Sequence, residues 1–375
     1  MAGIYIHIPF CKQACHYCNF HFATSHRYKK ELIQALPIEL ELHKAYLGPD
    51  ATIETIYFGG GTPSLLTQTE TMSIFDAVFK HYHTDLREVT FEANPDDLTV
   101  DYLEALSETP VNRLSIGVQS FFEEDLRWMN RAHTQQQAEN CIRMAMDTGF
   151  NHLTIDLIYG APTTTDAMWQ HNMQKAIELG IEHISAYALT VEDKTPLSKM
   201  IRTGQAQTVN ADKSATQFVM MVKTLTEAGF EQYEISNFAK NRQYALHNTS
   251  YWQGVHYLGI GPSAHSYDGR SRCWNIANNR QYIKSVVNGI IPAESELLTT
   301  ADRFNELIMT GLRTMWGVSL QALEQLDSSY ATLFQQNIQK YISAGQMKLE
   351  SGSCILTQEG KILADGIASD LFVLT

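Results

Sequence analysis

Short apolar runs alternate with longer segments of helical periodicity along the first half of the chain. The runs are rich in β-branched and aromatic residues, which fit a pleated and buried surface, so they predict strands. The predicted strands are Ile4–Ile8, Glu54–Phe58, Val89–Glu92, Arg113–Val118, Leu153–Ile158 and His183–Leu189.

The segments between these runs predict helices. One apolar face, at i, i+3, i+4 and i+7, consists of Ala138, Cys141, Ile142 and Ala145. Three helices are expected to end at glycines that are followed by an apolar residue: Gly149, Gly180 and Gly229. Pro37 interrupts the helical pattern from Lys30 to Tyr46, so that helix is expected to be kinked or split.

Six strand–helix units with short connections predict an α/β fold with parallel strands covered by helices. We expect a partial (β/α)6 barrel over residues 1–190 and an extension of it over residues 191–298. From residue 299 to 375 the chain is rich in Leu and Gln, with a short strand pair at Met347–Leu349 and Cys354–Leu356 and a last helix from Gln358. Helices followed by a small hairpin predict a mainly helical, winged-helix-like C-terminal domain.

The composition is that of a globular protein without a nucleic-acid partner. The 375 residues are 44% hydrophobic and 18% charged, which is ordinary for a globular chain. A net charge of −13 argues against a nucleic-acid partner, because binding phosphates requires a basic surface. Neither a transmembrane run nor a signal peptide is visible, and a cytoplasmic location is expected.

The six cysteines are distributed unevenly. Three of them crowd into Cys11-Lys-Gln-Ala-Cys15-His-Tyr-Cys18, whereas Cys141, Cys273 and Cys354 are far apart and are assigned no chemistry. This distribution fits a metal site in a reducing compartment better than a disulfide scaffold. Three thiolates on one short loop can ligate three corners of a [4Fe–4S] cluster and leave the fourth iron open. The alternative is a zinc ion whose fourth ligand is His7, His16 or His21, although no second Cys-x2-Cys pair is present.

The Cys-x3-Cys-x2-Cys spacing, directly after the first predicted strand, resembles the signature of radical S-adenosylmethionine enzymes. In that family the open iron binds S-adenosylmethionine, and an electron from the cluster releases a 5′-deoxyadenosyl radical. The family's fold is the partial barrel predicted above. The resemblance therefore implies a [4Fe–4S] cluster on Cys11, Cys15 and Cys18, bound S-adenosylmethionine and, if the cluster is reduced, an electron donor such as a flavodoxin or ferredoxin.

Polar residues lie at the carboxyl ends of the predicted strands, where barrel active sites are built. A buried carboxylate in an apolar strand is costly unless it is paired, and a glycine run lets the backbone approach a ligand. By resemblance to the coproporphyrinogen-oxidase-like branch, the positions that contact S-adenosylmethionine are Tyr5, Gly60, Gly61, Thr62, Glu92, Gln119, Arg131 and Asp156. Arg131 is expected at the start of a helix, where it can pair with the ligand carboxylate.

This branch contains two kinds of protein, an oxygen-independent coproporphyrinogen III dehydrogenase and the HemW-type heme chaperones. The dehydrogenase typically continues its triad to a fourth cysteine, whereas Phe20 follows here as it does in the chaperones. The segment His247-Asn-Thr-Ser-Tyr-Trp252 also resembles a motif associated with the chaperones. The resemblance therefore favours a heme chaperone that delivers heme to apo-hemoproteins, with the dehydrogenase and an unrelated radical enzyme as alternatives.

The residues around this motif favour a planar apolar ligand independently. From Gln243 to Tyr267 the chain carries no Asp, Glu, Lys or Arg, but it contains three histidines and several aromatic rings. Neutral imidazole is a common axial ligand of heme iron. His247 is therefore the candidate heme contact, and Tyr251 and Trp252 are candidate pocket walls.

Overall fold

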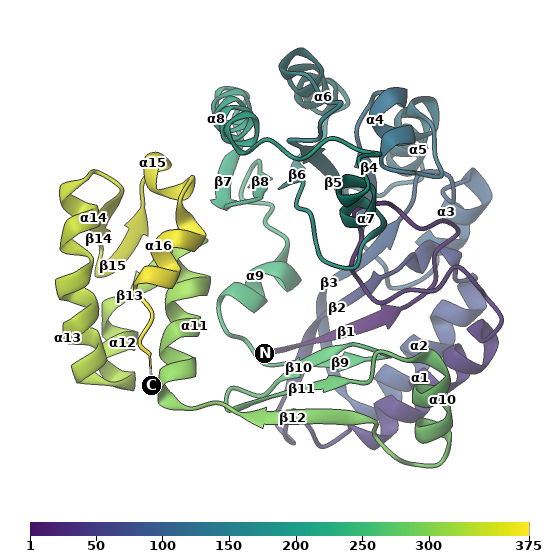
Figure 1. Ribbon diagram of the computed structural model, residues 1–375. Helices are drawn as coiled ribbons and strands as arrows, with labels where there is room; N and C mark the ends of the chain where they lie inside the picture. The colour runs from purple at the N-terminus through teal and green to yellow at the C-terminus, as the bar shows by residue number, and fades with distance from the viewer. Residues whose placement is uncertain (375) are drawn as a thin grey trace.

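Six parallel strands form the centre of a long curved sheet (Figure 1). They are β1 (Ala2–Ile8), β2 (Thr52–Gly60), β3 (His83–Ala93), β4 (Arg113–Gln119), β5 (His152–Tyr159) and β6 (His183–Ala188). Each strand pairs in parallel with the next. The computed structural model, which describes residues 1–374, thus confirms all six predicted strands and the partial barrel. Strand β3 begins earlier than predicted: its first residues, His83 to Arg87, are exposed or only partly covered and include one apolar residue, Leu86, so they form no apolar run in the sequence.

Helices cover the outer, convex face of this sheet (Figure 1). They are α1 (Lys29–Leu42), α2 (Gln68–His81), α3 (Val100–Ser107), α4 (Glu123–Trp128), α5 (Gln135–Asp147) and α6 (Asp166–Glu178), with a 3-10 turn η1 (Pro63–Leu65) after β2. The predicted apolar face of α5 is confirmed, because its four residues are buried. The apolar faces of α1, α2, α3, α5 and α6 and of the strands share one hydrophobic core.

The predicted helix ends are also confirmed. Gly149, Gly180 and Gly229 all adopt positive φ, which costs glycine little. Pro37 lies inside α1, so the helix that was predicted to be kinked or split is not split. The apolar residues around Pro37, among them Leu36 and Leu40, are fully buried, and their packing outweighs the hydrogen bond that proline cannot donate.

Residues beyond β6 add strands to both edges of the sheet. The pair β7 (Glu231–Glu234) and β8 (Asn237–Ala239) extends it past β6, whereas β9 (Tyr257–Ile260) pairs in parallel with β1. Antiparallel strands β10 (His265–Tyr267), β11 (Ser271–Asn275) and β12 (Ala293–Leu297) follow on that side. The complete order is β12-β11-β10-β9-β1-β2-β3-β4-β5-β6-β8-β7.

Four helices belong to this part of the chain: α7 (Pro196–Arg202), α8 (Ala211–Glu227), α9 (Leu246–Trp252) and α10 (Asn279–Val287). Unlike the covering helices, α9 lies on the concave side of the sheet (Figure 1). The backbone N–H groups of Leu246 and His247 both donate to the buried carboxylate of Glu88 on β3, at 2.8 Å. These two hydrogen bonds satisfy two otherwise unpaired backbone donors and fix the start of α9 inside the barrel.

The C-terminal residues form a separate small domain. Its helices are α11 (Thr300–Leu312), α12 (Leu320–Leu326), α13 (Ser328–Asn337), α14 (Gln339–Ser343), α15 (Gln358–Lys361) and α16 (Ala364–Asp370), and its strands are β13 (Val318–Ser319), β14 (Met347–Glu350) and β15 (Ser353–Leu356). The strands pair in the order β13-β15-β14, and the domain has its own hydrophobic core. The predicted hairpin and winged-helix-like arrangement are confirmed.

The single helix predicted from Gln358 is wrong, because two short helices stand there. Gly360 packs so closely on the hairpin that a Cβ at this position would lie 2.0 Å from the carbonyl oxygen of Gln346. The chain turns at Ile362 and Leu363, and α16 then packs against α11.

The C-terminal domain docks on the β7 edge of the sheet. Arg313, just after α11, donates from Nε to the buried carboxylate of Glu234 on β7 at 3.2 Å and from Nη1 to Asp365 on α16 at 2.7 Å. Backbone bonds join the same segments, from Ile235 N to Arg313 O and from Met315 N to Tyr233 O, both at 3.0 Å. Among the described residues, no helix has the length and apolar character needed to cross a membrane.

Candidate functional site

The three predicted cluster ligands lie on the loop between β1 and α1. Cys11, Cys15 and Cys18 are all free thiols and partly exposed. Burial raises the pKa of Cys11 to about 11 and raises that of Cys18 as well. A metal must therefore displace protons from these thiols at neutral pH.

Neighbouring segments hold this loop in place. The N–H of His16 donates to Met129 O at 3.1 Å, and the side chain of Asn130 donates to Ala14 O at 2.7 Å. Both partners come from the connection between α4 and α5. The loop is thus ordered by contacts with the β4 side of the barrel.

The histidines that a zinc ion would need are engaged elsewhere. His7 bonds through Nε2 to the carbonyl of His21 at 2.9 Å, and His16 bonds through Nδ1 to that of Trp128 at 2.8 Å. His21 bonds through Nε2 to Asn279 at 2.7 Å. Within residues 1–374 no three His, Cys, Asp or Glu side chains converge on a point where a single metal ion could bind. A zinc ion needs one of these histidines as its fourth protein ligand, whereas a [4Fe–4S] cubane takes the three thiolates at separate corners and needs no histidine.

Arg131 lies beside the cysteine loop. Its Nη1 donates to Cys15 Sγ at 3.3 Å, and its Nη2 donates to Asn94 Oδ1 and Gly117 O, each at 2.7 Å. Its buried Nε has no hydrogen-bond partner among the described residues. The guanidinium is therefore able to receive an additional anionic group.

The expectation that Arg131 starts a helix is wrong. It lies in the connection before α5, which begins only at Gln135. Thr134 caps this helix, because its hydroxyl accepts from the N–H of Gln137 while the Gln137 side chain accepts from the N–H of Thr134. The capping box fixes the helix start and leaves Arg131 free to reach Cys15.

Glu92 and Asp156 lie half-buried on β3 and β5, without an ion pair to any described residue. Burial raises the pKa of both carboxyl groups to about 7, and for Asp156 the neighbouring Glu92 adds to the rise. Glu92 accepts from Tyr57 Oη at 2.7 Å and from Gly60 N at 3.2 Å. A bound cation or hydroxyl donor would relieve both carboxyl groups.

The glycine run after β2 allows close packing at this site. Gly60 has φ +105°, and a Cβ there would lie 2.4 Å from the ring of His7. A Cβ on Gly61 would lie 2.6 Å from Phe10 O. Thr62 follows, buried, and its hydroxyl accepts from Asn94 Nδ2 at 3.3 Å.

Gln119 ends β4 with φ +65°, an unusual conformation for a residue other than glycine. Its amide nitrogen and the Nη2 of Arg131 are each 3.0 Å from the point where a Cβ on Gly117 would stand. In the same way, a Cβ on Gly59 would meet Tyr5, Tyr57 and Glu92 within 3.2 Å. The predicted contacts thus gather into two neighbouring groups on the concave side of the barrel.

Sequence reasoning missed two residues that link these groups. Tyr57 donates to Glu92, and Asn94 connects Arg131 with Thr62. Tyr57 alternates with the fully buried Ile56 and Phe58 along β2, which was a signal that it faces the interior of the barrel. Asn94 directly follows Glu92-Ala93 at the carboxyl end of β3. The rule that singled out Glu92, that polar residues at the carboxyl ends of barrel strands build the site, therefore also indicates Asn94.

His247 is not accessible in this structure. Its side chain is 1% exposed, and its Nδ1 and Nε2 bond to Thr55 Oγ1 and Tyr251 Oη, both at 2.8 Å. Burial lowers its pKa to about 3, so the ring is neutral. Its function in this arrangement is to hold Tyr251, so the predicted direct contact with a ligand is not supported here.

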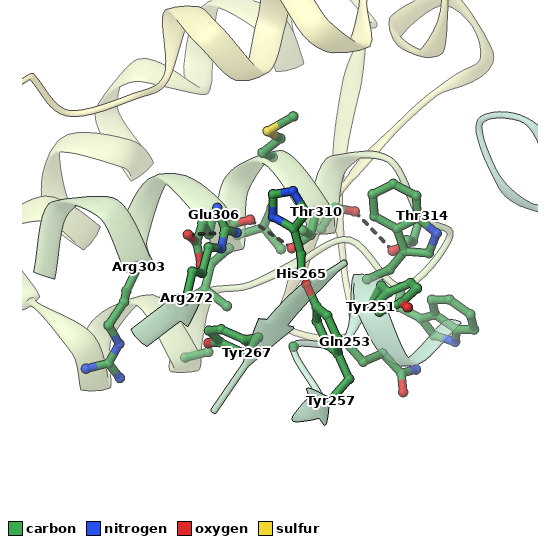
Figure 2. A pocket seen from close by; sticks show the side chains of 18 of the residues that line it. Tyr251, Gln253, Tyr257, His265, Tyr267, Arg272, Arg303, Glu306, Thr310 and Thr314 are labelled. Carbon is green, nitrogen blue, oxygen red and sulfur yellow. Dashed lines mark hydrogen bonds and ion pairs between the residues drawn. The ribbon is translucent and has the colours of Figure 1, made fainter. Parts of the chain in front are cut away.

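A cavity of about 1190 Å³ separates the concave face of the sheet from α11. Tyr251 and Trp252, the candidate pocket walls, line it, and so does Phe20 from the cysteine loop, a residue that is 68% exposed. Figure 2 shows Tyr251, Tyr257, His265 and Tyr267 on one side, with Glu306, Thr310 and Thr314 on the other. The cavity thus extends from the cysteine loop to the C-terminal domain.

Comparison with known proteins places this arrangement in a family. The profile of the Radical SAM superfamily matches residues 5–176, and that of the HemN C-terminal domain matches residues 298–363. The heme chaperone HemW of Bacillus subtilis is 33% identical over 98% of both chains, and that of Mycobacterium tuberculosis is 31% identical over 98% of this chain and 94% of its own. The solved structure of coproporphyrinogen III oxidase (HemN) from Escherichia coli has the same fold, with a TM-score of 0.85 and 21% identity over 99% of this chain and 90% of its own. This chain therefore belongs to the radical SAM superfamily and, within it, to the HemW family.

Proposed function

We propose that this protein is a heme chaperone, which binds heme and transfers it to apo-hemoproteins in the cytoplasm. The observation that carries the proposal is the aromatic cavity between the barrel and α11, with Phe20 in its wall. The relatives named as heme chaperones align over nearly the whole chain, including both walls of this cavity. The Phe20 ring occupies the position where the dehydrogenase typically has a further cysteine.

We also propose that the site holds a [4Fe–4S] cluster and S-adenosylmethionine. Three free thiols on one ordered loop fit the cluster. The unpartnered Nε of Arg131 fits the carboxylate of S-adenosylmethionine, and the half-buried Glu92 and Asp156, whose carboxyl pKa values are raised, fit its ammonium and hydroxyl groups. The remaining contacts are assigned to Tyr5, Gly60, Gly61, Thr62 and Gln119. A reduced cluster supplies single electrons, for which a flavodoxin or ferredoxin is the expected donor.

The cluster assignment is tested by replacing one thiol. After anaerobic reconstitution, Cys18→Ser is expected to lose most of the bound iron and sulfide, together with the visible absorbance of the cluster, because a cubane needs all three thiolates. Cys273→Ser, a partly exposed thiol far from the loop in sequence, serves as the matched control and is expected to retain all three. Equal iron and sulfide contents in the two variants would contradict the assignment.

Heme binding is tested by titrating the full-length protein and following the Soret band. His247→Ala is expected to weaken heme binding without changing the position of the Soret band, since His247 acts through Tyr251. A shifted Soret band in His247→Ala would instead indicate that His247 binds the heme iron directly.

The second candidate is an oxygen-independent coproporphyrinogen III dehydrogenase, which the fold shared with the Escherichia coli oxidase favours. Robust anaerobic conversion of coproporphyrinogen III to protoporphyrinogen IX would establish it against the chaperone. Cleavage of S-adenosylmethionine that another metabolite stimulates, and porphyrins do not, would indicate an unrelated radical enzyme.

A further inference from the structure

Two different structural units form the walls of the large cavity. The barrel side supplies α9, β10 and β11, and the C-terminal domain supplies α11 (Figure 2). Aromatic rings are concentrated on the barrel side: Tyr251, Trp252, Tyr257 and Tyr267. Flat apolar walls of this kind suit a large planar ligand.

Of the three histidines that line the cavity, one differs from the others. His7 bonds through both ring nitrogens, to Tyr5 Oη at 3.1 Å and to His21 O at 2.9 Å, and His21 bonds to Asn279. Neither ring nitrogen of His265 forms a hydrogen bond with any described residue. Its side chain is exposed to the cavity and projects from β10 toward α11 (Figure 2).

Neighbouring strands fix the position of His265. It pairs with Trp274 on β11, and the two rings stack with centroids 6.2 Å apart and an interplanar angle of 30°. Burial and the positive charge of Arg272 lower its pKa, so the imidazole is neutral and its lone pair is available. A neutral imidazole whose ring is held by stacking and whose nitrogens are free is suited to bind a metal.

Two guanidinium groups line the same cavity. Arg272 on β11 forms an ion pair with Glu306 on α11, at 2.8 Å between Nη2 and Oε1. Arg303, one turn earlier on α11, forms no ion pair with any described residue and extends at one end of the cavity (Figure 2). Guanidinium groups bind carboxylates through two parallel hydrogen bonds.

We propose that heme binds in this cavity with His265 on its iron and with Arg272 and Arg303 on its two propionates. The inference rests on the proposed function and adds to it the iron ligand and the orientation of the ring. The nitrogen lone pair of His265 forms the bond to iron, and no electron is transferred. Arg272 exchanges Glu306 for a propionate, which removes one of the ionic contacts between barrel extension and α11.

The iron ligand is tested by comparing heme with metal-free protoporphyrin IX, each titrated into the full-length protein. His265→Ala is expected to shift the Soret band and to weaken heme binding about tenfold or more, while the affinity for protoporphyrin IX changes less than about twofold. His256→Ala, an exposed histidine that does not line the cavity, is the matched control and is expected to resemble the wild type. His265→Asn is a second variant that keeps a polar side chain at the same position.

The propionate contacts are tested with heme and its dimethyl ester, which carries no carboxylate charge. Arg303→Gln and Arg272→Gln are each expected to weaken heme binding about tenfold and to leave ester binding unchanged. Arg270→Gln, an exposed arginine outside the cavity, is the control. Equal effects on heme and ester, or none on either, would overturn the assignment of the arginines.

Failure of this inference and failure of the proposed function give different results. Wild-type protein that binds no heme contradicts the heme chaperone and this assignment together. Wild-type protein that binds heme, with an unchanged Soret band and affinity in both His265 variants, overturns only the iron ligand proposed here.

Discussion

Half-buried ionisable groups that lack a counter-ion are the residues that distinguish this molecule from an ordinary barrel. Glu92 and Asp156 have no cation beside them, and the half-buried Arg131 keeps one buried donor, its Nε, without a partner among the described residues. Such groups cost stability unless something completes their bonding. Their position beside the cysteine loop is the physical reason to expect a charged ligand there.

A further buried carboxyl group, Glu39, has a structural function that pH can test. It accepts hydrogen bonds from Gly261 N at 2.8 Å, from Asn275 Nδ2 at 2.5 Å and from Tyr282 Oη, and His43 Nε2 lies 3.8 Å away. Burial raises its pKa from the ordinary 4.5 to about 7. Between these values the folded protein binds more protons than the unfolded chain, so the free energy of unfolding falls as pH rises and levels off above pH 7.

The Glu39→Gln variant is therefore expected to lose this pH dependence, which amounts to about 3 kcal/mol for a shift of this size. Because the Gln amide faces the donor on Asn275, the variant also carries a constant cost. Urea unfolding between pH 5 and 8 measures both quantities. The difference in midpoint between variant and wild type gives the constant cost, and the change of each midpoint with pH gives the pH dependence. Identical pH slopes for wild type and variant would show that Glu39 does not titrate in this range.

At the scale of elements, the ends of strands decide where the site forms. The carboxyl end of β2 turns through Gly60, the end of β4 through Gln119, and both use positive φ. These turns direct backbone N–H groups and side chains toward the concave side of the barrel, as in the bond from Gly60 N to Glu92. Helix α9 contributes Tyr251 and Trp252 to the cavity from the same side.

Gly60→Ala tests this packing. The positive φ alone is expected to cost about 1–2 kcal/mol, and the contact with the His7 ring a further 1–3 kcal/mol. Gly180→Ala is the matched control, because it shares a positive φ but has no atom within 4 Å of its Cβ position. His7→Ala by itself loses the hydrogen bonds to Tyr5 and His21, so the steric contribution is isolated by a cycle of wild type, Gly60→Ala, His7→Ala and the double variant. Chemical unfolding of these four proteins is expected to show that Gly60→Ala costs less, by the second contribution, when His7 is already alanine. No difference between Gly60→Ala and Gly180→Ala would contradict the close approach.

At the scale of the whole molecule, the cavity exists because two domains meet across it. Arg313 joins them, with Glu234 on the barrel side, Asp365 on the C-terminal side and the Trp252 ring 5.4 Å from its guanidinium carbon. Glu234 is almost fully buried and depends on this partner.

Arg313→Met is expected to lower the free energy of unfolding by about 2–3 kcal/mol, because it leaves the Glu234 charge buried with only its bonds to Ser236 N and Asn237 Nδ2. It is also expected to speed hydrogen exchange in α11. Lys348→Met removes an exposed ion pair with Glu350 and is expected to change stability by less than about 0.5 kcal/mol. Unchanged exchange in α11 of Arg313→Met would show that the docking does not depend on this residue.

The sequence by itself determined the six central strands, the three helix ends at glycines and the loop that carries the cysteines, because these depend on local periodicity and on residues with special backbone preferences. It also indicated Glu92, Gln119 and Asp156 by their position at or near strand ends. Family resemblance added Arg131, although its predicted helix position was wrong, because α5 begins at Gln135 with Thr134 as its cap.

Only the tertiary structure decided which polar groups meet. The bonds from His247 to Thr55 and Tyr251 withdraw its ring from solvent, and the pairing of β10 with β11 leaves His265 beside Trp274 and exposed. Residues 20, 251, 265 and 303 are far apart in the sequence, yet they line one cavity between two domains. Contacts between distant segments depend on how whole elements pack, which no local pattern of apolar and polar residues records.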